Sequence, residues 1–175
     1  DTTKVRTLNS LFFSYEYVDV EKAKDVLDKA ISLSDKIGDQ TGRARTYNFL
    51  GYYYEDQGDF KLAIKNYFIA LKISQASKNQ IGISEAYNNI GTAYNSLGNL
   101  NEALIYHNRS LKIREAINSK KGVASSLNNI AMVYNSQGNY SSSLKNLFAA
   151  LKINEEMGNK AWQANNYNNI GNIYV

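Results

Sequence analysis

Apolar residues recur along the chain at separations of three and four residues. One series starts at Tyr47 and a second follows Phe60; their members are Tyr47, Leu50, Gly51 and Tyr54, then Ala63, Ile64, Tyr67, Phe68, Ala70 and Leu71. This spacing places the side chains of each series on one face of an α-helix. The pattern therefore predicts two successive amphipathic helices in this stretch, each packing through its apolar face.

The two-helix pattern repeats with a period of 40 residues. The segment YNFLG at 47–51 returns as YNNIG at 87–91, LNNIA at 127–131 and YNNIG at 167–171. In the same phase, ALKI at 70–73 returns as SLKI at 110–113 and ALKI at 150–153. Repetition at a fixed period indicates one supersecondary unit stacked several times along the chain.

Two kinds of break in each period predict where helices end. Gly followed by Asp or Asn lies between the two helices, at 58–59, 98–99 and 138–139. Gly ends helices in the left-handed conformation, and we expect Asp59, Asn99 and Asn139 to cap the next helix. Asn99 and Glu102 have the spacing of a capping box. Further breaks at 38–42, 78–82, 118–122 and 158–160 separate the periods, and such short connections predict antiparallel neighbouring helices.

These positions resemble the tetratricopeptide repeat (TPR) family. The resemblance is carried by Tyr47, Leu50, Gly51, Tyr54, Gly58, Ala63, Tyr67 and Ala70, by Tyr87, Ile90, Gly91, Tyr94, Gly98, Ala103 and Ser110, and by Ile130, Tyr134, Gly138 and Ala150. The standard repeat has about 34 residues, so this chain is similar to the longer, 40-residue type found in kinesin light chains and bacterial signalling regulators. The resemblance implies an all-α, right-handed superhelix (an α-solenoid) of antiparallel TPR helix pairs.

The same period predicts how the chain is divided. We expect a single TPR domain over 1–175, with a degenerate capping repeat at 1–40, full repeats at 41–80, 81–120 and 121–160, and the first helix of a truncated repeat at 161–175. Residues 20–31 fit a second helix, preceded by a first helix over about 3–17 with Val18 where Gly belongs. The truncated last repeat leads us to expect that the parent protein continues.

Asparagine recurs where helix packing does not require it. One slot holds Asn in four repeats, at positions 48, 88, 128 and 168, and the next slot holds it at 89, 129 and 169. Asn95 and Asn135 lie seven residues beyond Asn88 and Asn128, two turns along the same face. Asn is a mediocre helix former, so its recurrence indicates another use.

The resemblance implies that this face of each first helix lines a concave groove. Carboxamides offer both donors and acceptors, so a row of them suits the backbone of an extended peptide. The predicted binding residues are Arg45, Asn48, Tyr52, Glu85, Asn88, Asn89, Thr92, Asn95, Asn128, Asn129, Met132, Asn135, Asn165, Asn168, Asn169 and Asn172. Two alternatives stay open: duplication simply copied the Asn residues, or their amides bond to neighbouring helices.

Composition narrows the chemistry. The chain has no Cys, which excludes thiolate metal sites and thiol nucleophiles, and its one His, His107, falls in a packing slot. The net charge of +4 is dispersed, unlike the clustered basic surface of a nucleic-acid binder. No apolar run approaches the roughly 18 residues of a membrane span. We therefore expect no catalytic residue, cofactor, metal, nucleic acid or membrane insertion in this segment, while its compartment stays open.

The predicted function is a non-catalytic protein–protein interaction module that holds an extended peptide or partner segment in the groove. A second hypothesis is a sensor or regulatory segment of a bacterial histidine kinase or helix-turn-helix regulator, because the opening residues 1–9 resemble the start of such TPR regions. A third is a passive scaffold that self-associates through the ends of the solenoid. An enzyme would need several titratable groups around His107.

Overall fold

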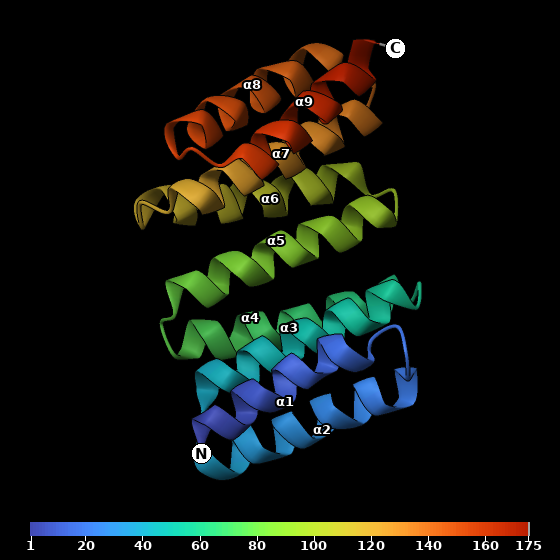
Figure 1. The fold of residues 1–175 in the computed structure, drawn as a ribbon, viewed down its shortest axis with the longest axis vertical. Helices are drawn as coiled ribbons and strands as arrows, with labels where there is room; N and C mark the ends of the chain where they lie inside the picture. Colours follow the sequence, from blue (N-terminus) through green and yellow to red (C-terminus); the bar gives the residue numbers. More distant parts are fainter. Residues whose placement is uncertain (175) are drawn as a thin grey trace. The chain divides into compact units, whose positions relative to one another are not determined.

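The computed structural model describes residues 1–174, and over that range every regular element is helical. The nine α-helices are α1 (Thr2–Tyr15), α2 (Val20–Ile37), α3 (Gln40–Asp56), α4 (Phe60–Ala76), α5 (Gln80–Ser96), α6 (Leu100–Ala116), α7 (Lys120–Ser136), α8 (Tyr140–Glu156) and α9 (Lys160–Tyr174). Successive helices are joined by short turns (Figure 1). The all-α fold class predicted from the repeats is confirmed.

The chain forms two compact units, which we describe separately. The N-terminal unit is Asp1–Ala93 and holds α1 to α4 with most of α5; the C-terminal unit begins at Tyr94 and holds the last turn of α5 with α6 to α9. Contacts in the first unit join α1 to α2 and α3 to α4, and in the second α7 to α8 and α8 to α9. These are the helix pairs that the repeat predicts; the division into one domain with numbered repeats stays a prediction.

The turns within the repeats form largely as their residues predict. Gly58, Gly98 and Gly138 adopt left-handed φ values of 75°, 77° and 72°. Asp59 Oδ1 then accepts a hydrogen bond from the Leu62 backbone N–H at 3.0 Å, and Asn139 Oδ1 accepts one from that of Ser142 at 3.1 Å.

The predicted capping box at Asn99 is wrong. Asn99 stands at the N-cap of α6, but its side chain makes no capping hydrogen bond. The side chain is exposed, where water can satisfy the first N–H groups, and the carboxylate of Glu102 in the first turn stabilises the same end of the helix dipole. The helix begins there because the Asn99 carbonyl accepts the Ala103 N–H at 3.0 Å.

Some predicted boundaries also need correction. The first helix ends at Tyr15 rather than near residue 17, because the Val18 and Asp19 N–H groups both turn back to the Tyr15 carbonyl. This turn has no glycine, and Val18 itself is exposed. Three of the breaks between repeats are shorter than the predicted five residues. The first of them ends at Asp39, which caps α3 through the Gly42 N–H at 2.8 Å, so that α3 begins at Gln40.

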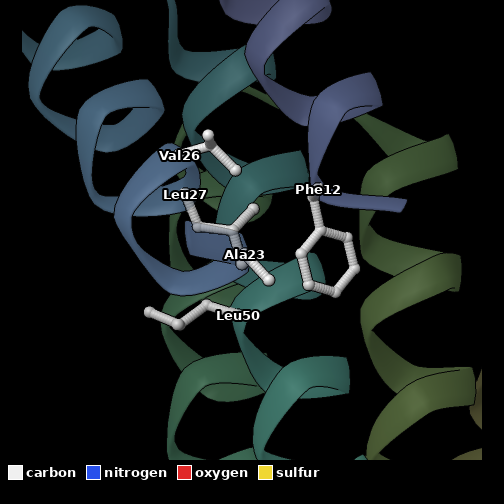
Figure 2. Close-up of a cluster of buried hydrophobic side chains, with 5 residues drawn as sticks. All are labelled: Phe12, Ala23, Val26, Leu27 and Leu50. Atoms are coloured by element: carbon white, nitrogen blue, oxygen red, sulfur yellow. The ribbon is translucent and has the colours of Figure 1, made fainter. Parts of the chain in front are cut away.

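Buried apolar side chains from three helices form the core of the N-terminal unit. Phe12 of α1, Ala23, Val26 and Leu27 of α2, and Leu50 of α3 converge there (Figure 2). Burying a side chain of the size of Phe12 or Leu27 contributes about 1.5–3 kcal/mol. In the C-terminal unit the corresponding cluster consists of Ala131, Leu147, Leu151 and Ile170. Each unit therefore holds its first helices in place with its own core.

Candidate functional site

All the predicted binding residues lie on the first helices α3, α5, α7 and α9. Their exposure differs: Asn48 is buried; Arg45, Tyr52, Glu85, Met132, Asn165, Asn168 and Asn172 are exposed; and Asn88, Asn89, Thr92, Asn95, Asn128, Asn129, Asn135 and Asn169 are half-buried. Thr92 uses its hydroxyl on its own helix, donating to the Asn88 carbonyl at 3.1 Å. The helical placement agrees with the sequence pattern, while a binding role for these residues stays a prediction.

Part of the amide row links one repeat to the next. Asn89 Nδ2 donates to Asn48 Oδ1 at 3.4 Å in the N-terminal unit. The same pairing recurs in the C-terminal unit, where Asn169 Nδ2 donates to Asn128 Oδ1 at 3.0 Å. The alternative that the amides bond to neighbouring helices therefore holds for these four residues. Each bond uses only part of a carboxamide, which offers two N–H donors and an oxygen with two lone pairs.

A small crevice lies beside the first of these pairs. It is lined by the α3 residues Ala44, Arg45 and Asn48 and by the α5 residues Ile81, Gly82 and Glu85, with Thr41 and Asn79 at its edge. Its volume is about 30 Å³, which is the share of one water molecule. Two predicted residues of opposite charge, Arg45 and Glu85, thus line one site, but the space between these repeats is nearly filled.

A larger pocket occupies the corresponding place in the C-terminal unit. It measures about 150 Å³ and is lined by Ala124, Ser125 and Asn128 of α7, Asn154 of α8, and Trp162, Asn165 and Asn166 of α9. Sequence reasoning predicted Asn128 and Asn165 but missed Asn154, Trp162 and Asn166. A signal was available, because the only Trp of the chain stands 40 residues after Gly122 and 80 after Gly82.

Aromatic residues give the N-terminal unit a different surface on its first helices. The rings of Phe13 and Phe49 meet edge to face with centroids 5.0 Å apart, and Phe12 stacks on Phe49 at 6.0 Å. The Tyr52 and Tyr17 hydroxyl oxygens lie 3.4 Å apart. This hydrogen bond, with burial and the Glu16 carboxylate, raises the pKa of Tyr52. Tyr52 is one of the residues predicted from the sequence, whereas Phe12 and Phe13 of α1 are not.

The single histidine is packed, as its slot predicts. His107 is buried on α6, and burial, with the Arg114 charge nearby, lowers its pKa from 6.5 to about 4. Its imidazole is therefore neutral at neutral pH and shielded from solvent. Among the described residues, no group of three or more His, Cys, Asp and Glu side chains is placed to hold a metal ion. No helix over residues 1–174 has both the length and the apolarity to cross a membrane.

Comparison with known families agrees with the helix pairs. Two tetratricopeptide repeat models match the chain, one over residues 42–116 and the other over 123–157. Together they cover more than half of its length. A search of curated proteins finds no match.

Many solved structures share the fold. BtubC (BKLC) from P. vanneervenii superposes with a TM-score of 0.86 at 21% identity, over 97% of this chain and 71% of its own. A Rap protein complexed with Competence and Sporulation Factor gives 0.85 at 16% identity, over 98% of this chain and 52% of its own. A third match is the signal transduction ATPase with numerous domains (STAND) protein from Pyrococcus horikoshii, which has a tetratricopeptide repeat sensor. Its TM-score is 0.82 at 19% identity, over 98% of this chain and 26% of its own.

These identities are low, so the structural likeness concerns the fold alone. This chain also spans only about half of the Rap protein and a quarter of the STAND protein. The family models, the 40-residue period and the antiparallel helix pairs nevertheless lead to one conclusion. The chain belongs to the tetratricopeptide repeat family.

Proposed function

We propose that this chain is a non-catalytic protein-interaction module that binds an extended peptide or partner segment along the first helices of its repeats. The observation that carries the proposal is the regular row of Asn residues on α3, α5, α7 and α9, of which Asn48, Asn89, Asn128 and Asn169 also bond one repeat to the next. Tetratricopeptide repeats typically serve as interaction modules, and helical grooves recognise short segments through backbone and side-chain contacts. Buried His107 offers no accessible general base, which favours binding over chemistry.

The known relatives support the same proposal. A Rap protein of this fold was solved in complex with Competence and Sporulation Factor, so this helix arrangement is compatible with holding a ligand. In our chain the amide bonds between repeats hold Asn48 and Asn128 in place, and each carboxamide of the row carries two N–H donors and an acceptor oxygen that suit a peptide backbone. Fixed amides lose little freedom on binding, which favours affinity.

The test uses a random 12-residue peptide library displayed on phage and selected on the immobilised chain. Affinities of the selected peptides are then measured by calorimetry for the wild-type chain and for Asn88→Ala/Asn129→Ala/Asn168→Ala. Each hydrogen bond contributes about 0.5–1.5 kcal/mol, so we expect the triple variant to bind at least about tenfold more weakly.

A matched control carries the same chemical change on the second helices. Asn101 and Asn108 lie on α6 and Asn146 on α8, and Asn101→Ala/Asn108→Ala/Asn146→Ala is expected to bind as the wild type does. Circular dichroism establishes that both variants are folded. Equal weakening in the two variants, or a selection that enriches no peptide, would contradict the proposal.

A second candidate function is a sensor segment of a larger signalling protein. It is favoured by the STAND protein, in which a tetratricopeptide repeat region is named as the sensor. The sequence of the parent gene beyond this segment tests it, because a kinase, nucleotide-binding or DNA-binding domain in the same protein is then expected.

A further inference from the structure

The pocket of the C-terminal unit is lined by neutral residues, most of them polar, with apolar surface from Ala124 and Trp162. Six of its lining residues bear on its chemistry: Ser125, Asn128, Asn154, Trp162, Asn165 and Asn166. None of the residues that line it carries a charge. Lys121 lies at its margin, with Nζ 5.5 Å from the centre of the Trp162 ring. The volume of about 150 Å³ equals about five waters, which is room for a side-chain group of several heavy atoms.

A chain of amides fixes the inner wall. Asn154 Nδ2 donates to Asn166 Oδ1 at 2.7 Å, and Asn166 Nδ2 in turn donates to Asn128 Oδ1 at 3.4 Å. In both bonds the amide nitrogen of one residue donates to the amide oxygen of the next, so the three carboxamides point the same way along the chain of bonds. Asn154 is only 1% exposed, and its Oδ1 is buried with no hydrogen-bond partner among the described residues. Buried polar atoms are nearly always paired. Ser74 Oγ, at the equivalent position of the N-terminal unit, is also unpaired among the described residues, but only Asn154 lines a pocket with room for a donor from outside the chain.

The N-terminal unit shows that the repeat does not need these amides. Eighty residues earlier, Ser74 stands for Asn154, Ala86 for Asn166 and Gly82 for Trp162. At the mouth, the charged Arg45 and Glu85 are replaced by Ser125 and Asn165. The same helix pairing is therefore made with small residues and two charged residues, around a crevice of about 30 Å³. The amide set is a feature of the C-terminal pocket and not of the fold.

The walls select one kind of ligand group. The unpaired oxygen of Asn154 requires an N–H or O–H donor, while the exposed carboxamide of Asn165 offers both a donor and an acceptor. Without a charged lining residue, burying an ammonium, guanidinium or carboxylate would be costly. A flat group suits the face of Trp162. A primary carboxamide meets all these conditions, since it is neutral, planar, and both donor and acceptor.

We propose that this pocket takes the carboxamide side chain of a Gln or Asn residue in the bound peptide. The proposal rests on the function proposed above and adds a specificity for one side chain. The donor to Asn154 Oδ1 is the carboxamide N–H of the ligand, and Asn165 closes the mouth of the pocket over it. The N-terminal crevice, which is lined by the charged Arg45 and Glu85 and has a smaller volume, does not accept this group.

The test uses small probes and the single tryptophan. N-acetylglutamine methylamide is titrated into the ¹⁵N-labelled chain while the indole N–H signal of Trp162 is followed by NMR; N-acetylglutamate methylamide, of nearly the same shape, is the comparison. We expect a saturable shift at millimolar concentration with the glutamine probe and at least fivefold weaker binding of the glutamate probe. In Asn154→Ser/Asn166→Ala, which installs the residues of the N-terminal unit, the glutamine probe binds at least fivefold more weakly.

Two further variants guard against a folding artefact. Asn165 is exposed, so Asn165→Ala leaves the core intact. We expect this variant to bind the glutamine probe more weakly than the wild type does. Asn146 lies outside the pocket and bonds to its own helix at the Ser142 carbonyl, so Asn146→Ala is expected to change nothing.

The results separate this inference from the proposed function. Equal shifts with both probes, or none, would overturn the carboxamide assignment and leave a pocket that holds water only. If selected peptides still depend on Asn88, Asn129 and Asn168, the proposed function stands without it. If the glutamine probe alone shifts the Trp162 signal but the phage selection enriches no peptide, the carboxamide does not come from a bound peptide. That result would contradict the proposed function as well.

Discussion

The same packing position is solved differently in the two units. In the N-terminal unit, Tyr67 of α4 lies over Gly51 of α3, and its hydroxyl donates to Glu55 Oε2 at 2.7 Å. A Cβ atom on Gly51 would clash with the Tyr67 ring. Eighty residues later the pair is Leu147 and Ala131, which pack in one buried cluster.

The repeat therefore tolerates substitutions at this position when the facing residues change together. A large ring demands glycine opposite it, while the smaller Leu leaves room for the methyl group of Ala. Glu55 accompanies the tyrosine hydroxyl, and Asn135 stands in its slot where that hydroxyl is absent. Burial raises the pKa of Glu55, and the Tyr67 hydrogen bond opposes that shift.

His107 on α6 occupies the repeat position that holds Tyr67 in α4 and Leu147 in α8. Because it is a buried histidine, it makes the free energy of unfolding depend on pH. The folded pKa of about 4 lies below the ordinary 6.5, so the unfolded chain binds the proton more readily. Stability is therefore complete above pH 6.5 and is lost as pH falls toward 4. The lost stability is about 3 kcal/mol over that window.

The control for this effect is His107→Leu, which installs the residue of the following repeat. Chemical denaturation between pH 4 and 7 is expected to give a flatter profile for the variant than for the wild type. Carboxylates contribute equally to both proteins, so identical slopes would show that His107 is not the group responsible.

The second prediction compares glycines in one repeat position. Gly51→Ala forces the new methyl group against Tyr67 and is expected to cost about 1–3 kcal/mol. At Gly171 the same Cβ meets nothing within 4 Å, so Gly171→Ala is expected to be neutral or to stabilise the helix by about 0.5–1 kcal/mol. Urea unfolding of the two variants measures the difference.

A rescue variant sharpens the same comparison. Gly51→Ala/Tyr67→Leu/Glu55→Asn installs the matched set of the C-terminal unit and is expected to recover part of the lost stability. If the triple variant is no more stable than Gly51→Ala alone, the three residues do not act as a set.

The smallest effect concerns the turns between repeats. Lys78 and Asn118 both adopt φ of 54°, where Gly38 and Gly158 stand at the equivalent positions. A left-handed conformation strains Lys more than Asn, so Lys78→Gly is expected to stabilise the chain by about 0.5 kcal/mol, after the entropy cost of glycine. Asn118→Gly is expected to gain less, and a larger gain at Asn118 in thermal unfolding would contradict the strain argument.

Much of the fold could be predicted because its signals are local and repeated. Turns and caps act within a few residues of chain, as the glycines at 58, 98 and 138 and the caps Asp59 and Asn139 show. The 40-residue period then repeats these local signals along the sequence. The capping prediction failed at Asn99, where water and Glu102 can serve the same N–H groups. The end of α1 was misplaced because a turn without glycine leaves no mark in the sequence.

The candidate site was only half predictable. The row of Asn residues on the first helices was visible as a pattern, but its inter-repeat bonds, Asn89 to Asn48 and Asn169 to Asn128, join residues 41 apart in the chain. Asn154 lies on a second helix, outside that pattern. No periodicity connects it with Asn166, because their contact exists only once α8 and α9 pack.

Helical spacing, turn residues and a fixed period are properties of the chain, so the helices, their order and the family can be read from the amino acids alone. Which amides bond between repeats, that Tyr67 meets Gly51, and that one inter-repeat space is a pocket while its counterpart is nearly filled become visible only in the folded chain. Volume and hydrogen-bond satisfaction depend on residues that packing brings together from distant parts of the sequence. One tryptophan in place of a glycine changes the shape of such a space, and its neighbours in three dimensions decide how.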